Sequence, residues 1–364
     1  MKRSYRCFYA LLIALFLLPG NSNGQKLATQ KNAAPLEHAV DEIMKGFTTH
    51  TPGASVLILK NDTIIFQKGY GLKQVGQRGR IDPFTNFRLA SVTKQFTAAS
   101  ILLLQQNGKL SLNDPVINYL PNLPAYARAV RISHLLNHSS GLPDYEDLIP
   151  NAQTEQVHDA DCLELIHKAD SLYFVPGDAY RYSNTGYALL ALIVEKISGK
   201  RFATFLDSAI FKPLHMQHTV AYENGISKVK NRAFGHSLIN GNWEQTDQSN
   251  SSAVLGDGGI YSNVNDLAKW IAALWNYRLL SKNVQDQAWS STLFNNRQVN
   301  NYGFGWHIEK YSKGFHPYHS GSSIGFRNYL NLFPEEKIMV VVLTNRNSAD
   351  PKTICKQISA LLVE

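Results

Sequence analysis

The chain carries the stretch Phe87-Arg-Leu-Ala-Ser91-Val-Thr-Lys94-Gln-Phe-Thr-Ala-Ala-Ser-Ile-Leu-Leu-Leu104, in which a serine and a lysine stand three residues apart. Its apolar residues recur at helical spacing, and Asn107-Gly108 is a usual C-terminal cap pair. The pattern therefore predicts a buried helix that ends at this pair. Because residues three apart lie on one face of a helix, the Lys94 amine can reach the Ser91 hydroxyl.

This pairing has a chemical use. A serine hydroxyl becomes a strong nucleophile when a base takes its proton, and a buried lysine amine can be such a base. Backbone N–H groups at a helix N-terminus can stabilise the oxyanion that forms. The same Ser-x-x-Lys spacing recurs at Ser227 and Lys230, but there the stretch is polar and we interpret it as a solvated loop. Ser91 and Lys94 are therefore the candidate nucleophile and base.

The N-terminus has the pattern of an export signal. In this 364-residue chain, three cations precede an apolar run from Cys7 to Leu18, and small residues precede a plausible cleavage site near Gly24/Gln25. A membrane span needs about 20 apolar residues, so this run is too short, and no later segment is long enough. We therefore expect residues 1–24 to be a signal peptide, the protein to be periplasmic or secreted, and no transmembrane segment.

Charge and cysteine content exclude some partners. The formal net charge is +8, and removing three N-terminal cations leaves 33 Lys+Arg against 28 Asp+Glu, or +5. No basic cluster has interleaved aromatic residues, so nucleic acid is not an expected partner. Cys355 has a core-like position in the last helical segment, so we expect Cys162 and Cys355 to be two separate buried thiols rather than a disulfide.

Strand patterns lie at both ends of the chain and helical patterns in the middle. The predicted strands are Ala54–Leu59, Thr63–Tyr70, Gly303–Ile308, Phe326–Phe333 and Ile338–Thr344, the first two joined by the turn pair Asn61-Asp62. Helical patterns precede the first strand and close the chain. We expect an α+β fold, in which an antiparallel sheet is flanked by N- and C-terminal helices and carries a large, mainly helical insertion. The predicted sheet domain comprises residues 25–90 and 300–364, and the insertion 91–299.

Two further stretches could supply partners for the serine. A Pro/Gly-rich loop carries Tyr182 and Asn184 into a buried helix, and a tyrosine beside a lysine ammonium suits proton relay. Tyr-x-Asn recurs at three other tyrosines, but only this copy opens an apolar helix. The second stretch includes His319 and Gly321 just before a strand. An edge strand there could offer backbone N–H groups to an acyl substrate, Gly321 would allow close approach, and His319 could donate a hydrogen bond or a partial charge.

Together these stretches resemble the serine β-lactamase-related hydrolases, which include class C β-lactamases, serine D-alanyl-D-alanine peptidases, D-aminopeptidases and several esterases. The resemblance covers roughly residues 35 to 362. The family motifs Ser-x-x-Lys, Tyr-x-Asn and Lys/His-x-Gly appear in order at Ser91/Lys94, Tyr182/Asn184 and His319/Gly321. Similar flanking stretches are Leu135–Leu142, Pro176-Gly177, Gly256–Ser262 and Gly303–Trp306.

The resemblance implies a β-lactamase/transpeptidase-like fold, no metal or organic cofactor, and a role for each motif. Ser91 would be acylated, and Lys94 and Tyr182 would share its proton and deliver it to the leaving group. Asn184 would hold the substrate amide or Lys94. The backbone N–H groups of Ser91 and Ser322 would form the oxyanion hole, and water would release the acyl group.

One departure bears on the substrate. His319 stands where β-lactamases of this family usually carry lysine, and a histidine with an ordinary pKa of ~6.5 is mostly neutral at pH 7. The resemblance therefore favours the peptidase, aminopeptidase and esterase branches over β-lactam hydrolysis. Cell-wall peptides ending in D-alanine, other D-amino-acid peptides, β-lactams and small esters all fit the same machinery. The sequence does not indicate an oligomeric state.

Other patterns point to different chemistry. Gly321-Ser-Ser323-Ile-Gly325 matches a nucleophile elbow, but a strand pattern follows it where a helix would be required. His134 and His138 have a zinc-compatible spacing but lack the neighbouring glutamate of a zinc protease, so we expect a structural role. Asp257-Gly-Gly259 could line the site or simply form a turn. We expect an exported serine hydrolase that cleaves an amide or ester bond through a Ser91 acyl-enzyme. The expected type is a β-lactamase-related, penicillin-binding peptidase. The alternatives are an esterase or D-aminopeptidase of the same family, or a non-catalytic relative that binds cell-wall peptides.

Overall fold

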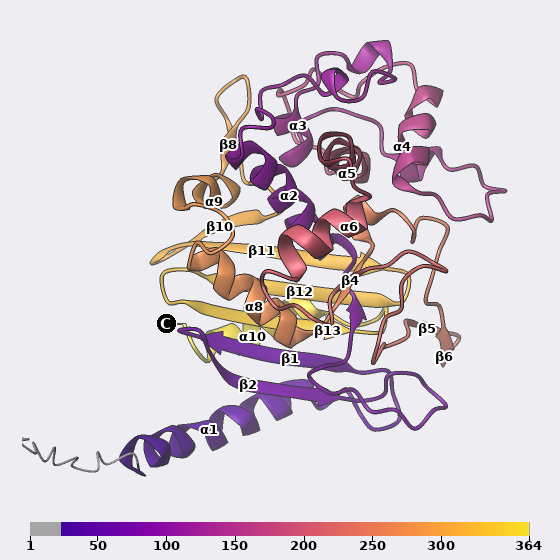
Figure 1. Cartoon of the computed structure of the whole chain (residues 1–364). Helices are drawn as coiled ribbons and strands as arrows, with labels where there is room; N and C mark the ends of the chain where they lie inside the picture. The colour runs from indigo at the N-terminus through magenta and orange to yellow at the C-terminus, as the bar shows by residue number, and fades with distance from the viewer. Residues whose placement is uncertain (1–22, 364) are drawn as a thin grey trace, which may run out of the picture.

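A six-stranded antiparallel sheet forms the base of the molecule, and the computed structural model describes residues 23–363 of it (Figure 1). The strand order is β10-β11-β12-β13-β1-β2. Their bounds are β1 (Ala54–Lys60), β2 (Thr63–Tyr70), β10 (His307–Tyr311), β11 (Gly314–Ser323), β12 (Phe326–Phe333) and β13 (Ile338–Thr344). The sheet thus joins the two ends of the chain. Most of the predicted signal peptide, residues 1–22, lies outside the described residues.

Both faces of the sheet are covered (Figure 1). Alternate residues of a strand point to opposite faces, and in β1 both sets are buried. Val56 and Ile58 belong to a cluster with α1 (Asn23–Met44) and α10 (Pro351–Ala360), whereas Leu57 and Leu59 belong to the cluster that includes α8 (Val264–Trp275). The predicted flanking of the sheet by N- and C-terminal helices is confirmed.

Most of the remaining helices form a layer beyond the sheet, beside β10 and β11 (Figure 1). They are α2 (Lys94–Gln106), α3 (Ile132–Leu136), α4 (Asp159–Leu165), α5 (Asn184–Ser198), α6 (Phe202–Leu206), α7 (Leu255–Gly258) and α9 (Lys282–Ala288). The central helix α2 ends at Asn107, and Gly108 follows with φ +65°, as the cap pair predicts.

Short strands complete the layer. β3 (Phe87–Arg88), β4 (Val220–Ala221) and β7 (Ile260–Ser262) form a small sheet under the start of α2, with β7 in the middle. Two hairpins are β5 (His236–Ile239) with β6 (Asn242–Gln245), and β8 (Thr292–Leu293) with β9 (Val299–Asn300). The small sheet matters for function because β3 leads directly into the Ser91 turn.

One predicted strand is misplaced. The strand predicted at Gly303–Ile308 begins at His307, and Gly305 before it bends with φ +78°. A Cβ at Gly305 would lie 2.8 Å from the Lys94 carbonyl oxygen. Gly305 therefore serves close packing against the start of α2 rather than a strand.

The cysteines agree with the sequence prediction. Cys162 and Cys355 are free, buried and in different clusters. No helix in the described part of the chain is long and apolar enough to cross a membrane.

Candidate active site

Ser91 lies on a tight turn between β3 and α2. The turn, Ala90–Thr93, is a 3₁₀ helix that runs directly into α2, so Ser91 precedes the α-helix rather than opening it as predicted. Ala90 has φ +51°, a left-handed conformation that is unfavourable for a residue with a Cβ. Such strain is often found where a fold holds a reactive side chain in place. The turn leaves Ser91 partly exposed while its neighbours are buried.

The Lys94 amine is fully buried and makes three contacts. Its Nζ lies 3.4 Å from Ser91 Oγ, 2.7 Å from Asn184 Oδ1 and 3.0 Å from the Asp257 carbonyl oxygen. The last two oxygens can only accept hydrogen bonds. A neutral amine has two N–H groups and one lone pair, so it can satisfy both oxygens and turn its lone pair to the Ser91 hydroxyl. The contacts therefore fit a lysine that receives the serine proton.

Asn184 is held at the first position of α5, directly after its N-cap Ser183. Its backbone N–H donates to Asp144 Oδ2 at 2.7 Å, and its side-chain Nδ2 donates to Glu146 Oε2 at 3.1 Å. Because a lysine only donates and a carboxylate only accepts, these partners fix which end of the amide faces Lys94. Asn184 was expected to hold either the substrate amide or Lys94, and in the structure its side chain contacts Lys94.

Asp257 lies in α7, on the other side of Lys94. Its carboxylate accepts a hydrogen bond from the hydroxyl of Tyr145 at 2.8 Å, and the tyrosine is fully buried. Burial raises the pKa of the Asp257 carboxyl to about 7, an effect that the nearby positive charge of Lys94 opposes. The Asp257 stretch thus lines the site rather than forming a bare turn.

Tyr182 contacts Lys94 through its ring. The Lys94 Nζ lies 4.9 Å from the ring centroid, and the ring packs on His138 with centroids 4.2 Å apart. The Tyr182 hydroxyl is buried and has no hydrogen-bond partner among the described residues. No hydrogen bond therefore joins this hydroxyl to Ser91 or Lys94 in the substrate-free protein, where catalytic contacts are often still open.

The third motif lies on β11, where that strand has a free edge. β10 pairs with β11 only as far as Tyr318, and the hairpin to β12 closes at the pair Ser323–Phe326 around a two-residue turn. The closing pair of such a turn exchanges its own hydrogen bonds, so Ser322 points its backbone N–H away from β12. The predicted oxyanion donor Ser322 thus presents its N–H at the free edge.

His319 is buried, and both of its ring nitrogens have protein partners. Nδ1 lies 2.6 Å from the Ser320 carbonyl oxygen, which can only accept, so Nδ1 carries the proton. Nε2, 2.9 Å from the Tyr302 hydroxyl, is therefore the acceptor. Burial holds the pKa of His319 well below its ordinary value. The ring is thus neutral near pH 7 and its polar atoms are already engaged.

Gly321 has a packing role that the sequence did not indicate. A Cβ at this position would lie 2.1 Å from the Leu89 carbonyl oxygen and 3.3 Å from Asn328 Nδ2. Leu89 stands two residues before Ser91, so Gly321 lets β11 approach the strand that carries the nucleophile. Its expected role in substrate approach stays a prediction.

A cavity of about 180 Å³ opens beside Ser91. It is lined by Arg88, Ala90, Ser91, Tyr145, Glu146, Asn184, Ser249, Ser251, Ser252, Asp257, Gly258, Ser322, Ser323 and Ile324. The structure therefore brings together Ser91, Asn184 and Ser322 around one space, with Lys94 buried behind them. Tyr182 and His319 do not line it.

Several lining residues were not predicted from the sequence. Tyr145 and Glu146 follow a matching family stretch but show no pattern of their own, and the serines at 249–252 lie in a polar loop. The sequence does carry a signal for Arg88, because this charged residue stands between two apolar residues, Phe87 and Leu89, which are both fully buried.

The other sequence patterns lie elsewhere. Ser227 lies in a turn where its Oγ bonds the Glu223 backbone, and Lys230 is exposed. His138 accepts from the Ser183 backbone N–H, and no cluster that could hold a metal ion occurs in the described residues. The elbow-like Gly321–Gly325 stretch is a β-hairpin rather than a strand-to-helix turn.

Sequence comparisons show the family to which the chain belongs. A family model described as Beta-lactamase matches residues 36–362. The chain is 32% identical over 312 residues to penicillin-binding protein 4* of Bacillus subtilis (strain 168). This alignment covers 82% of the chain and 69% of that protein. It is 30% identical over 322 residues to protein flp of Staphylococcus aureus (strain MRSA252), covering 86% of this chain and 62% of flp. The chain thus spans less than two thirds of flp.

Solved structures show the same fold. The octameric penicillin-binding protein homologue from Pyrococcus abyssi aligns with a TM-score of 0.78 and 29% identity, over 91% of this chain and 77% of that chain. A D-amino acid amidase from Ochrobactrum anthropi SV3 aligns with a TM-score of 0.76 and 23% identity, over 90% and 97% of the two chains. These likenesses confirm the expected β-lactamase/transpeptidase-like fold.

Proposed function

The chain belongs to the beta-lactamase family of serine hydrolases, and we propose that it cleaves an amide or ester bond through an acyl-enzyme on Ser91. The observation that carries this proposal is the contact set of Lys94. A buried amine with two obligate acceptors, Asn184 Oδ1 and the Asp257 carbonyl, has one direction left, and Ser91 Oγ lies along it at 3.4 Å. The amine is thereby aligned as the base for the serine.

The reaction follows from these positions. Lys94 takes the hydroxyl proton as Ser91 Oγ bonds to the substrate carbonyl carbon, and the backbone N–H groups of Ser91 and Ser322 stabilise the oxyanion. The intermediate collapses, the bond to the leaving nitrogen or oxygen breaks, and the proton passes from Lys94 to that atom through the Tyr182 hydroxyl. A water molecule then attacks the acyl-enzyme by the same proton route, releasing the acid and restoring Ser91.

The free edge of β11 supports the binding of an extended acyl substrate. An exposed strand edge binds peptides by main-chain hydrogen bonds, and here the edge faces the nucleophile. The buried, neutral His319 acts in this proposal through Tyr302 and the Ser320 carbonyl, holding the edge rather than contributing charge. This favours peptidase, aminopeptidase or esterase activity over the hydrolysis of β-lactams, as expected from the sequence.

Export is part of the proposal and rests on the signal-peptide pattern of residues 1–24. N-terminal sequencing of the protein recovered outside the cytoplasm tests it. A start near Gln25 is expected, whereas protein found only in the cytoplasm with Met1 retained would contradict export.

Hydrolysis of a substrate panel tests the activity. The panel contains a neutral p-nitrophenyl ester, D-alanine p-nitroanilide, a peptide ending in D-alanyl-D-alanine, and benzylpenicillin. We expect turnover of at least one that Ser91→Ala abolishes. Ser227→Ala is the matched control, because it removes the serine of the second Ser-x-x-Lys pair and should change nothing. Activity that survives Ser91→Ala would contradict the mechanism, and no turnover or adduct with any compound would favour the non-catalytic binding protein.

A further inference from the structure

Arg88 is a buried cation with few partners. Its side chain is 3% exposed, and its Nη2 donates to the Ser252 carbonyl oxygen at 2.7 Å. Its Nε and Nη1 have no hydrogen-bond partner among the described residues. None of the ion pairs found in residues 23–363 includes Arg88. The protein thus holds a charged guanidinium with only one of its three nitrogens bonded.

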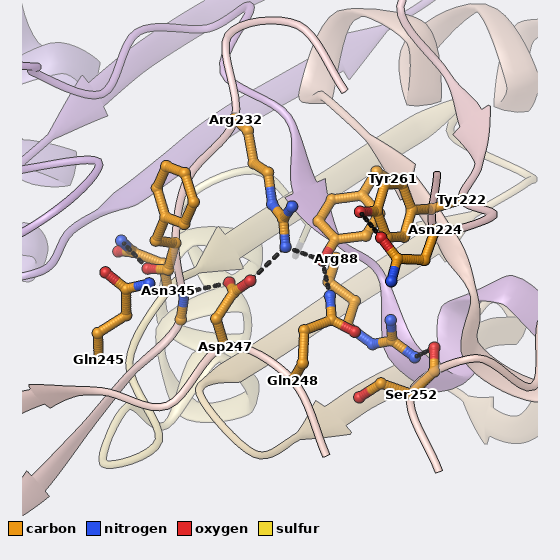
Figure 2. Close-up of polar contacts among 12 residues, drawn as sticks. Arg88, Tyr222, Asn224, Arg232, Gln245, Asp247, Gln248, Ser252, Tyr261 and Asn345 are labelled. Atoms are coloured by element: carbon orange, nitrogen blue, oxygen red, sulfur yellow. Dashed lines mark hydrogen bonds and ion pairs between the residues drawn. The ribbon is translucent and has the colours of Figure 1, made fainter. Parts of the chain in front are cut away.

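A neighbouring arginine shows what full pairing looks like. In Figure 2, Arg232 reaches the carboxylate of Asp247 and the hydroxyl of Tyr261, whereas the guanidinium of Arg88 is joined only to Ser252. Removing a cation from water costs several kcal/mol unless an anion or hydrogen bonds compensate it. Arg232 has a carboxylate partner within the fold, and Arg88 has none among the described residues.

The Arg88 side chain lines the cavity beside Ser91. Ser249, Ser251 and Ser252 line the same cavity, and the Ser249 hydroxyl oxygen lies 3.4 Å from that of Ser251 and 3.1 Å from that of Ser252. A guanidinium with adjacent hydroxyls is a common arrangement for holding a carboxylate.

We propose that Arg88 and the three serines form a subsite for a carboxylate on the acyl part of the substrate. This deepens the proposed hydrolase function and rests on it. Tyr182, which would protonate the leaving group, does not line this cavity, so the cavity takes the acyl part. The substrates are therefore amides or esters of acyl groups that carry a second, anionic carboxyl group.

Two carboxyl groups line the same cavity and must be weighed against this. Glu146 is exposed, so water and salt screen its charge. Asp257 accepts a hydrogen bond from Tyr145, and its raised pKa leaves much of it protonated at neutral pH. Arg88 keeps its full charge where screening is weakest. The net field deep in the cavity therefore favours an anion.

Paired substrates test the subsite. The p-nitrophenyl monoesters of succinate, glutarate and adipate carry a free carboxylate, and p-nitrophenyl butanoate, pentanoate and hexanoate are their neutral counterparts. For at least one pair we expect the wild type to prefer the acid by tenfold or more in kcat/KM, about 1.4 kcal/mol. Arg88→Met should reduce the preference to about one, and Arg88→Lys should keep part of it. The readout is the ratio of kcat/KM for the acidic ester to kcat/KM for its neutral counterpart, because a general loss of activity lowers both values equally.

Two further measurements keep the test decisive. If Arg88→Met does not fold, free glutarate should still inhibit wild-type hydrolysis of the neutral ester, while glutaramide should not. If none of these esters is hydrolysed, the hydrolase proposal is decided by the substrate panel alone, and the subsite is tested by binding. The thermal midpoint of Ser91→Ala should then still rise with glutarate and not with glutaramide. Equal rates on all ester pairs, an unchanged ratio in Arg88→Met, or equal effects of glutarate and glutaramide would each overturn the subsite.

Discussion

Lys94 and Arg88 are two buried basic side chains on either side of the Ser91 turn, and their surroundings differ. Lys94 is fully buried and has a partner for each hydrogen-bonding direction of its amine. Arg88 is almost as buried, yet it is bonded only to the carbonyl of Ser252. Both side chains come from one short stretch of chain, so the difference lies in the hydrogen-bond partners that distant parts of the chain supply to each.

These different surroundings suit the two side chains to different roles. A lysine whose partners are all fixed has one defined direction for exchanging a proton, which suits catalysis. An arginine left short of partners cannot lose its proton, so it suits the binding of an external anion. In this account the Lys94 region performs the reaction on any acyl substrate, and the Arg88 region selects among substrates.

Lys94→Met should have the largest effect. Removing the base should lower kcat/KM by about 10³-fold for neutral and anionic esters alike, because proton transfer is common to both. Lys230→Met, in the second Ser-x-x-Lys pair, is the control and should have no effect. If Lys94→Met changed the preference between the two ester classes instead of the common rate, the division of work between the regions would be wrong.

Asn184→Ala should have the next largest effect. It removes one of the two obligate acceptors of Lys94, so the amine is no longer held toward Ser91. We expect a tenfold to hundredfold loss, about 1–3 kcal/mol, mainly in kcat. Steady-state kinetics with one neutral ester measure it, and a rise in KM at unchanged kcat would show that Asn184 holds the substrate rather than the lysine.

Gly321→Ala should weaken the stretch that both regions share. The added Cβ would meet the carbonyl oxygen of Leu89, which lies between Arg88 and Ser91, so β11 must shift. We expect a loss of about 2 kcal/mol in the free energy of unfolding. Gly46→Ala is the control, because its Cβ would have no neighbour closer than 3.9 Å. Equal unfolding midpoints for the two variants would contradict the packing role.

Asp257→Asn should change how stability depends on pH. The pKa of Asp257 is raised from 3.8 to about 7, so between these values the native protein holds a proton that the unfolded chain has lost. Wild-type stability should therefore fall as pH rises through this window, by at most about 1.4 kcal/mol per pH unit from this group. Denaturant unfolding at several pH values should show a shallower slope for Asp257→Asn. Parallel slopes would show that the group is ionised in the folded protein.

The sequence predicted most of the sheet because local patterns determine it. The hairpin of β1 and β2 turns at Asn61 and Asp62, both with positive φ, a conformation these two residue types tolerate. The strand β11 was harder to predict, since His316 and His319 are buried polar residues that break the apolar pattern of a strand.

Within the site, the motif residues were found and their surroundings were not. Ser91 and Lys94 meet because they are three residues apart where the turn enters α2, and Asn184 meets Lys94 from the first position of α5. Tyr145 reaches Asp257 from 112 residues away, and Ser252 reaches Arg88 from 164 residues away, so only the fold reveals these contacts. The neutral state of His319 likewise follows from burial and from Tyr302, which sequence spacing cannot show.

The most direct test of the central claim is to locate the acyl group. The protein would be mixed with a slowly released acyl donor such as benzylpenicillin or a p-nitrophenyl ester, quenched with acid, and analysed by intact and peptide mass spectrometry. We predict one acyl group on the peptide that contains Ser91, formed in Ser227→Ala and absent from Ser91→Ala. An acyl group on another residue, or turnover that continues in Ser91→Ala, would contradict the account.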